Sequence, residues 1–595
     1  MRFRHAFPLL LSLLAMAATG TASAQSVPEN GRWSGLVSLT AGGFIEMPEG
    51  SNHDFLDTLV RVRQSSEAFI KYDHKKFGAS LQFKQSFDRK NTDSDKMVYV
   101  QQDSENYSQI DVSTRRVNTV QKQYDVRTDL RWSPSDRTRL TGYVLGSFNR
   151  DSSMNSIFQQ KLMSDQTSVT MEDVDNRRDA LGTGLRAEHQ FGKSRSLTGN
   201  ADWRREWDGK ISDWSGIYVE NDDPRSYRLT PYSVKDRVNA TVFYRDTTFA
   251  GVSGLIFEPG ARLTLNHDND HYSGATQYPD GSWRDSLSLR EDFMFIAMTL
   301  EPYVRTDYRK GKLSAYVEAG FQVYGTRLEN EIRHQALIMQ PVKPVGRLGG
   351  RWQFVPGHTV FWSGSLTVQR PAYQQICWYP RQGSYTNQLF IGNPGLKPAQ
   401  LLSAQVGYRF QYKRFSAETT TSYSLRNDEV IRTFSDIEID GRKFTQFTWV
   451  NAARTRTWIE KLTLGWDGTV VKANVSGLYH DLRQKQDPTD SVEDNRYWEL
   501  NGNLQVLLPA SWTLSADANY HSRIKTLYQI IDPYVRLNAR VQKKFGLAWT
   551  LFLEGKDLLE RPLGNGVISG FTKQTWYEET RQNRRIVQLG VVWQF

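Results

Sequence analysis

The chain has almost no cysteine and, after its first two dozen residues, no long apolar segment. Cys377 is the single cysteine among 595 residues, which excludes an intramolecular disulfide framework. We expect it to be an inert thiol packed beside Trp378. No run of the roughly 18 apolar residues that a membrane-spanning helix requires is present, and the mean hydropathy is −0.58. Spanning helices are therefore excluded.

Motifs of the common enzyme classes are also missing. The ten histidines are scattered, and there is no HExxH, Gly-x-Ser-x-Gly or phosphate-binding loop. We predict no catalytic residue, no metal site and no cofactor, and we do not expect an enzyme. The densest groups of potential cation ligands are His267–His271 and the acids Asp487, Asp490, Glu493 and Asp494. We interpret both as polar loops rather than as metal sites.

The last ten residues, 586–595, alternate between apolar and polar side chains and end on an aromatic ring. Every second residue is apolar: Val587, Leu589, Val591, Trp593 and Phe595. In a strand these side chains share one face, which suits a lipid-facing strand with its final ring in the interfacial aromatic girdle. A terminal strand of a soluble sandwich gives the same alternation.

The same segment carries the pattern polar–x–Gly–x–x–aromatic–x–Phe, at Gln588, Gly590, Trp593 and Phe595. This spacing resembles the terminal signal that the bacterial barrel-assembly machinery reads. The resemblance implies that this machinery is a partner of the chain.

The N-terminus carries the three parts of a secretory signal peptide. Arg2 and Arg4 precede an apolar core from Phe7 to about Ala18, and Ala22-Ser23-Ala24 ends the segment. We therefore predict a signal peptide over residues 1–24 and one domain over residues 25–595. Removal of the signal lowers the formal net charge from +10 to +8.

Alternating segments recur along the chain, and aromatic residues make up 12% of it. The clearest strand faces are Leu140–Phe148, Ala315–Val323 and Val535–Val541. Short connections are expected at 73–76, 310–312 and 412–414. Long polar connections are expected at roughly 88–120, 150–180, 205–235, 266–290, 325–342, 372–398 and 481–495. We predict an all-β fold, a large antiparallel transmembrane β-barrel of about 20–24 strands with short periplasmic turns and long extracellular loops.

Two motifs carry a family resemblance. An RPAYQQ run begins at Arg370, and a GNPGLKP box begins at Gly392, directly before an alternating segment from Leu401 to Phe410. The residues that match are Arg370, Pro371, Tyr373, Gly392, Asn393, Pro394, Leu396, Lys397 and Pro398. They resemble the barrel of TonB-dependent outer-membrane receptors of the Bacteroidetes type, from about residue 340 to the end. Ala399 stands where that family usually has Glu, and Glu554–Leu559 matches the family's penultimate element only in part.

The N-terminal region departs from the family. Such receptors carry a large N-terminal plug domain, whereas only residues 25–32 precede the first expected strand at about Trp33. We therefore predict a barrel without its plug, and TonB-dependent import is not implied. A barrel of about 22 strands would enclose a wide aqueous lumen. We expect long loops, a partner protein or a separately encoded plug to fill it.

The function expected from the resemblance is passage or uptake of a substrate across the outer membrane of a Gram-negative cell. One alternative is a non-transporting scaffold that binds a partner and is closed by its own loops. Another is an outer-membrane enzyme with a site in the extracellular loops. Between the two motifs lie four aromatic residues that either stack on a ligand or pack within the loop: Trp378, Tyr379, Tyr385 and Phe390.

The expected partners are outer-membrane lipid and lipopolysaccharide, the barrel-assembly machinery, and a separate plug or surface lipoprotein. Acids and bases interleave throughout the chain, so nucleic-acid binding is not expected.

Overall fold

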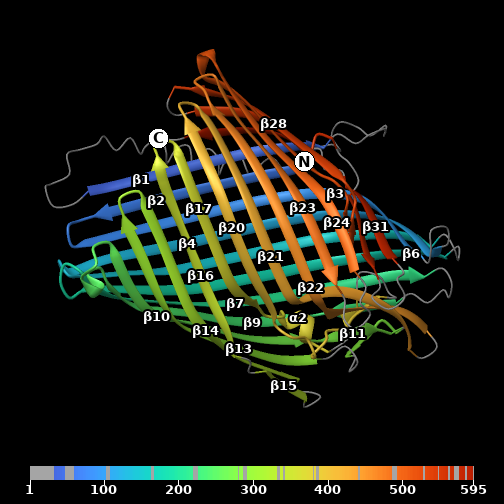
Figure 1. The fold of residues 1–595 in the computed structure, drawn as a ribbon. Coiled ribbons are helices and arrows are strands. Elements are labelled where there is room, and N and C mark those ends of the chain that lie inside the picture. Colours follow the sequence, from blue (N-terminus) through green and yellow to red (C-terminus); the bar gives the residue numbers. More distant parts are fainter. Residues whose placement is uncertain are drawn as a thin grey trace.

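A computed structural model gives the fold as one sheet of 32 strands (Figure 1). It describes residues 32–46, 59–101, 107–161, 166–218, 225–278, 280–285, 291–330, 335–339, 342–378, 381–382, 388–439, 442–485, 492–526, 529–546, 549–559, 563–568, 575–582 and 586–593. None of the helices in this part of the chain is long and apolar enough to cross a membrane.

Twenty-two strands form one continuous antiparallel ladder. In ladder order they are β1 (Arg32–Glu46), β2 (Leu59–Asp73), β3 (Phe77–Gln101), β4 (Tyr107–Ser135), β5 (Thr138–Lys161), β6 (Gln166–Gln190), β7 (Arg195–Tyr218), β9 (Tyr232–Asp246), β10 (Leu255–Tyr272), β13 (Glu291–Lys310), β14 (Leu313–Asn330), β16 (Val342–Val355), β17 (His358–Gln369), β20 (Ala399–Tyr412), β21 (Phe415–Ile439), β22 (Arg442–Asp467), β23 (Val471–Lys485), β24 (Val492–Leu508), β25 (Trp512–His521), β28 (Tyr534–Phe545), β29 (Trp549–Lys556) and β32 (Ile586–Trp593).

The remaining strands are short and extend the connections. They are β8 (Arg225–Leu229), β11 (Gly274–Gln277), β12 (Trp283–Asp285), β15 (Gln335–Met339), β18 (Arg381–Gln382), β19 (Gln388–Phe390), β26 (Ile524–Lys525), β27 (Gln529–Ile531), β30 (Leu563–Ile568) and β31 (Thr575–Gln582). Three single-turn helices complete the described elements: α2 (Tyr373–Ile376), η1 (Phe249–Gly251) and η3 (Pro509–Ser511).

The ladder closes on itself through the two terminal strands. β32 pairs with β29 on one side and with β1 on the other, so that Gly590 is opposite both Phe552 and Gly42. A closed ladder leaves no unpaired strand edge, which is the condition for crossing hydrocarbon with strands. The predicted fold class is therefore confirmed, and the ladder falls within the predicted range of strand numbers.

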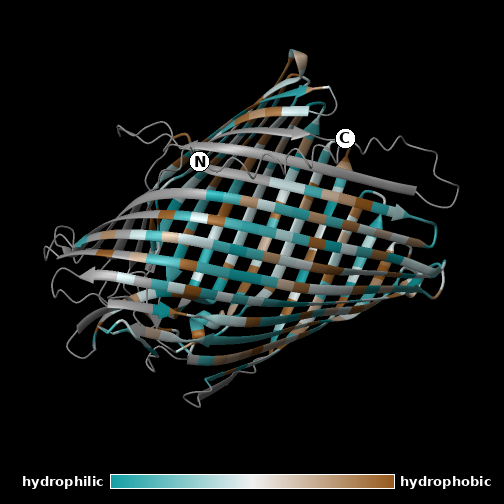
Figure 2. Cartoon of the chain, turned by 180° about the vertical axis from the view of Figure 1, so that it is seen from behind, coloured by the Kyte–Doolittle hydropathy of each residue, from teal (hydrophilic) through white to brown (hydrophobic). Residues whose placement is uncertain are grey.

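Side chains alternate between a lipid-facing outer surface and a polar inner surface. On β14, Val317 and Phe321 are 58% and 59% exposed, whereas Glu318 between them is 4% exposed. Figure 2 shows the same alternation of hydrophobic and hydrophilic residues along the ladder strands. Because only every second residue meets lipid, the barrel keeps a low mean hydropathy.

Two rings of outward aromatic residues bound the apolar band. On β22 these are Trp458 and Trp466, with Leu462 halfway between them at 51% exposure. Eight residues span about 27 Å along a strand, or roughly 19–22 Å in height for a strand tilted by 35–45°. This approaches the apolar band of about 25 Å that outer-membrane barrels present to lipid.

Short turns lie at one end of the barrel and long connections at the other. Two-residue turns connect β13 to β14 and β20 to β21. Lys310 pairs with Leu313 across the first turn, and Tyr412 pairs with Phe415 across the second. Both described chain ends lie at this short-turn end, since Arg32 pairs with Asp73 and Trp593 pairs with Trp549. This asymmetry matches the predicted periplasmic and extracellular ends.

The predictions of loops at 88–120, 150–180 and 205–235 are wrong in large part. The strands there continue as long hairpins: β3 pairs with β4 up to Gln101, and β5 pairs with β6 up to Lys161. The residues of these extensions are mostly polar, so the apolar alternation weakens in the sequence although the backbone pairing continues. Arg228 of β8 donates two hydrogen bonds, of 2.6 and 2.8 Å, to Asp213 of β7 and holds the pKa of that carboxyl below its ordinary value.

We predict that a cation on the outer face of β22 destabilises the barrel and that a cation on its inner face is tolerated. Leu462→Arg places a cation against lipid near the middle of the band, which costs about 2–4 kcal/mol. Thr463→Arg points into the polar lumen and is the matched control. Denaturant titration of the barrel refolded in lipid vesicles measures both, and equal stabilities for the two variants would contradict the assignment of the faces.

We also expect that deletion of residues 586–595 prevents assembly, because β1 and β29 would each lose a paired neighbour. The measurement is the heat-modifiable barrel in outer-membrane fractions. Wild-type levels in the truncated strain would show that β32 does not close the barrel.

Candidate functional site: the barrel lumen and its inward loop

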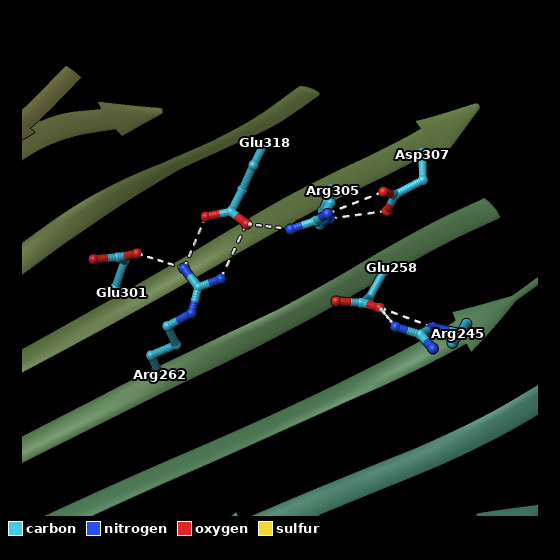
Figure 3. A network of polar contacts seen from close by, with 7 residues as sticks. All are labelled: Arg245, Glu258, Arg262, Glu301, Arg305, Asp307 and Glu318. Carbon is cyan, nitrogen blue, oxygen red and sulfur yellow. Dashed lines mark hydrogen bonds and ion pairs between the residues drawn. The ribbon is translucent and has the colours of Figure 1, made fainter. Parts of the chain in front are cut away.

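The lumen wall formed by β9, β10, β13 and β14 carries a network of charges (Figure 3). Arg262 of β10 bonds Glu301 of β13 at 2.6 Å and Glu318 of β14 at 2.9 and 3.0 Å. On the same wall Arg305 bonds Asp307 at 2.8 and 2.9 Å. These residues face inward because they alternate with exposed apolar residues such as Val304 and Val317.

Further contacts hold this network rigid. Arg245 of β9 bonds Glu258 of β10 at 2.7 and 2.9 Å, and Arg262 lies 3.9 Å from the ring centroid of Tyr303. Glu318 and Glu258 are almost fully buried, and each forms an ion pair with an arginine. Bidentate arginine–carboxylate contacts have fixed geometry. The network therefore lines the lumen with fixed, largely compensated charge.

The wall formed by β20–β25 is mostly neutral. Its inward positions carry hydroxyl and amide side chains: Ser403, Gln405, Thr420, Ser422, Ser424, Thr457, Thr463, Ser476, Asn501, Asn503, Gln505 and Asn519. Facing hydroxyls bond one another, as between Ser365 and Ser403 at 2.8 Å. Such a wall can exchange hydrogen bonds with water and with uncharged polar solutes.

The loop that contains both sequence motifs folds into the lumen at the end with the long connections. Ile376, Cys377 and Leu396 are 0–2% exposed and pack with Phe295 and Leu328 in one buried cluster. Phe295 of β13 lies on the same inward face as Glu301, so the cluster lies inside the barrel wall. The described residues of the loop, 370–378 and 388–398, thus occupy part of the lumen.

Close backbone contact explains the glycine of the second motif. The N–H groups of Gly392 and Asn393 donate to the carbonyls of Cys377 and Gln375, both at 2.7 Å. A Cβ atom on Gly392 would lie 2.2 Å from the Cys377 carbonyl oxygen, so no other residue fits without displacing the loop. Leu396, which is 1% exposed, packs in the same buried cluster as Cys377.

Asparagines anchor the same loop to β22. The Asn393 side chain donates to the Trp449 carbonyl at 2.9 Å and accepts from the Gly395 N–H at 2.9 Å. Asn451 exchanges hydrogen bonds with the Lys397 backbone in both directions, at 2.9 and 3.0 Å. Pro398 is buried, whereas Pro394 is exposed.

The first motif reaches the opposite side of the cluster. Arg370 donates to the Gln322 side chain at 3.0 and 3.2 Å and lies 4.0 Å from the Tyr324 ring centroid. Pro371 is buried, and Tyr373 packs edge-on against Phe293. The motifs therefore tie β13 and β14 to β21 and β22 through one inward loop.

The aromatic residues between the motifs pack where they are described. Trp378 lies against Phe293, and Phe390 stacks on Phe447 at 5.2 Å between ring centroids. Cys377 is fully buried in the cluster, as predicted. Tyr379 and Tyr385 lie outside the described residues, as does Phe595. Gln588, Gly590 and Trp593 lie in β32, and their recognition by the assembly machinery stays a prediction.

The interpretation of 267–271 as a loop is wrong, because these residues belong to β10. Strand alternation places His267 and His271 on one face and Asp268 and Asp270 on the other. Among the described residues no group of three or more His, Cys, Asp or Glu side chains is placed to hold a metal ion. Glu493 and Asp494 begin β24, while Asp487 and Asp490 are outside the described part.

The lumen network was missed by the sequence analysis. Its sequence signal is a set of polar residues at every second position, as in Glu301, Tyr303, Arg305 and Asp307 of one strand. That signal alone does not identify the partners, because the pairs Arg262–Glu301, Arg262–Glu318 and Arg245–Glu258 join different strands, and the register of those strands is not encoded locally.

Comparison with known proteins supports the fold. Residues 354–593 match the model of a family described as outer membrane protein beta-barrel family. This segment nearly coincides with the part of the chain in which the resemblance was found. A comparison with curated proteins found no match.

Several solved structures have a similar fold. The copper transporter OprC is 11% identical with a TM-score of 0.60, covering 96% of this chain and 84% of that one. The unliganded ferric citrate transporter FecA is 11% identical with a TM-score of 0.60, covering 96% and 79%. The siderophore receptor PiuA from Acinetobacter baumannii is 9% identical with a TM-score of 0.61, covering 95% and 82%.

The closed ladder, the lipid-facing band and these matches define the chain as an outer-membrane β-barrel. Its fold is similar to that of outer-membrane transporters and receptors. At 9–11% identity the likeness concerns the fold alone.

We predict that Gly392→Ala releases the inward loop, because the added Cβ collides with the backbone at Cys377. The rate at which maleimide labels Cys377, the single cysteine, measures the release of the loop. In the wild type Cys377 should resist maleimide labelling, and in the variant it should react at least about tenfold faster, the change that 1.4 kcal/mol of easier local opening produces.

Gly199→Ala is the matched control, since nothing lies within 4 Å of the added atom. Equal labelling of Cys377 in Gly392→Ala and the wild type would show that the close approach does not hold the loop.

Proposed function

We propose that the chain mediates passage or uptake of a hydrophilic solute across the outer membrane, through its lumen. The observation that carries this proposal is a closed ladder whose described inward positions on β9–β14 and β20–β25 are mostly polar or charged. A structure that only anchors a domain has no need for such a lumen. The names of similar folds, a copper transporter, a ferric citrate transporter and a siderophore receptor, point in the same direction.

The inward loop would act as a constriction of the path. It packs on β13 and β14 and contacts β21 and β22, so it lies across one side of the lumen. Solutes would then move along the remaining wall, between the neutral side chains and the charged network.

The proposal includes four further features: the receptor family, the signal peptide, the absent plug and the partners. We infer a relation to TonB-dependent receptors of the Bacteroidetes type from the two motifs. The signal peptide over residues 1–24 lies outside the described residues and stays a prediction, as does the absence of a plug. The barrel-assembly machinery and a separate plug or surface lipoprotein likewise stay predicted partners.

A scaffold closed by its own loops is the second candidate. The buried cluster beneath the inward loop favours it, because side chains 0–7% exposed do not open without cost. We do not propose an enzymatic activity, since the chain's similarity is to transporters and receptors.

Single-channel recording separates the two candidates. The purified full-length chain should conduct in planar bilayers, and Phe295→Ala with Leu328→Ala should raise the conductance by loosening the loop. Val317→Ala, on the lipid-facing side, is the matched control. Silence of the wild type and of the loosened variant would contradict passage and support the scaffold.

A further inference from the structure

The outward face of β22 and β23 places cations directly opposite one another. In the register of these strands Arg456 is opposite Arg483, and Arg454 is opposite Lys485. Directly opposed residues share one face with Cβ atoms about 4.5–5.5 Å apart, and like charges there destabilise the pair. They point outward because they alternate in step with Trp458 and Leu462, which are exposed.

Neighbouring acids neutralise the arginines of this face only in part. Arg483 lies 3.5 Å from Asp494, and Arg496 of β24 lies 3.3 Å from Asp481. The arginines are 59–71% exposed, and exposed pairs of this kind contribute little. The side chain of Arg456 has no hydrogen bond or ion pair with any described residue. The face therefore carries excess positive charge.

Outward aromatic residues lie directly on the membrane side of these cations. Tyr423 contacts Trp458 at 6.2 Å and Tyr479 contacts Trp498 at 4.7 Å between ring centroids. Trp458 also donates to Glu460, which accepts from Thr421 as well, both at 2.7 Å. Since aromatic girdles lie at the membrane interface, the cations lie at the level of lipid headgroups.

An apolar groove of about 770 Å³ runs along the outer face and ends at these aromatics. Small residues form its floor, namely Gly346, Gly364 and Ala404. Larger apolar side chains form its walls: Val317, Leu348, Trp362, Leu402 and Val406. It reaches Tyr423 and Trp458, so its end lies one same-face position from Arg456, about 7 Å along the strand. A groove of this size suits a hydrocarbon chain.

We propose that this surface binds lipopolysaccharide, with an acyl chain in the groove and lipid A phosphates on Arg454, Arg456 and Arg483. A phosphate between opposed guanidinium groups removes their repulsion and gains charge-assisted hydrogen bonds. The surface lies at the end of the barrel with the long connections, which faces the outer leaflet. The proposal does not depend on transport.

The surface differs from other outward arginines of the barrel. Arg205 of β7 is also near outward tryptophans, but it bonds Asp236 at 2.7 and 2.8 Å and is thereby neutralised. Opposed cations beside an apolar groove are the combination that selects an anionic amphiphile.

Native mass spectrometry of the delipidated full-length barrel tests the proposal. Arg454→Gln with Arg456→Gln should weaken binding of purified lipopolysaccharide by at least about tenfold. Lys193→Gln with Lys310→Gln removes the same charge at the short-turn end and should change nothing. Dephosphorylated lipopolysaccharide should bind the wild type as weakly as the intact lipid binds the arginine variant.

The groove is tested separately by Ala404→Leu, which fills its floor, against Ala240→Leu on the lipid-facing surface of β9, away from the groove. Only the first should weaken binding, with heat-modifiability confirming that both variants are folded. Unchanged binding by the arginine variant overturns the proposal, and so does equally tight binding of phosphatidylglycerol. Unchanged binding by Ala404→Leu overturns the role of the groove.

Discussion

The fold depends on one constraint: hydrocarbon offers no partner to backbone N–H and C=O groups. A sheet can satisfy them there only by closing, and in this chain β32 provides the closure by pairing with both β29 and β1. Every other feature follows from that closed wall, since it separates an apolar outer face from a polar inner face. The wall also fixes which strands become neighbours.

The inner face shows how polar groups are accommodated in such a wall. Between β9 and β14 charges are compensated in pairs across strands, as with Arg262 and Glu318. Between β20 and β25 hydroxyl and amide groups predominate, with a few charges such as the ion pair of Arg409 and Glu418. The inward loop adds a small hydrophobic core within the lumen, so the barrel contains two kinds of apolar surface, one against lipid and one around Leu328 and Leu396. The proposed path of the solute and the inward loop both lie in the barrel lumen.

Polar residues on both faces of a strand explain where the sequence analysis was wrong. At His267 to His271 neither face of β10 carries apolar side chains, so the segment has no apolar alternation and resembles a loop. Their backbone nevertheless continues the ladder with β9 and β13. Polar residues at these positions therefore do not mark the end of the strand.

The sequence by itself determined the strand period, the lipid-facing side chains and the terminal strand, because these are local patterns with a repeat of two residues. It also marked residues 370–398 through the motifs. Only the tertiary structure decided that this loop folds inward, that Gly392 touches Cys377, and that Arg456 opposes Arg483. Those contacts depend on strand register and closure, which arise from the whole ladder rather than from any segment of it.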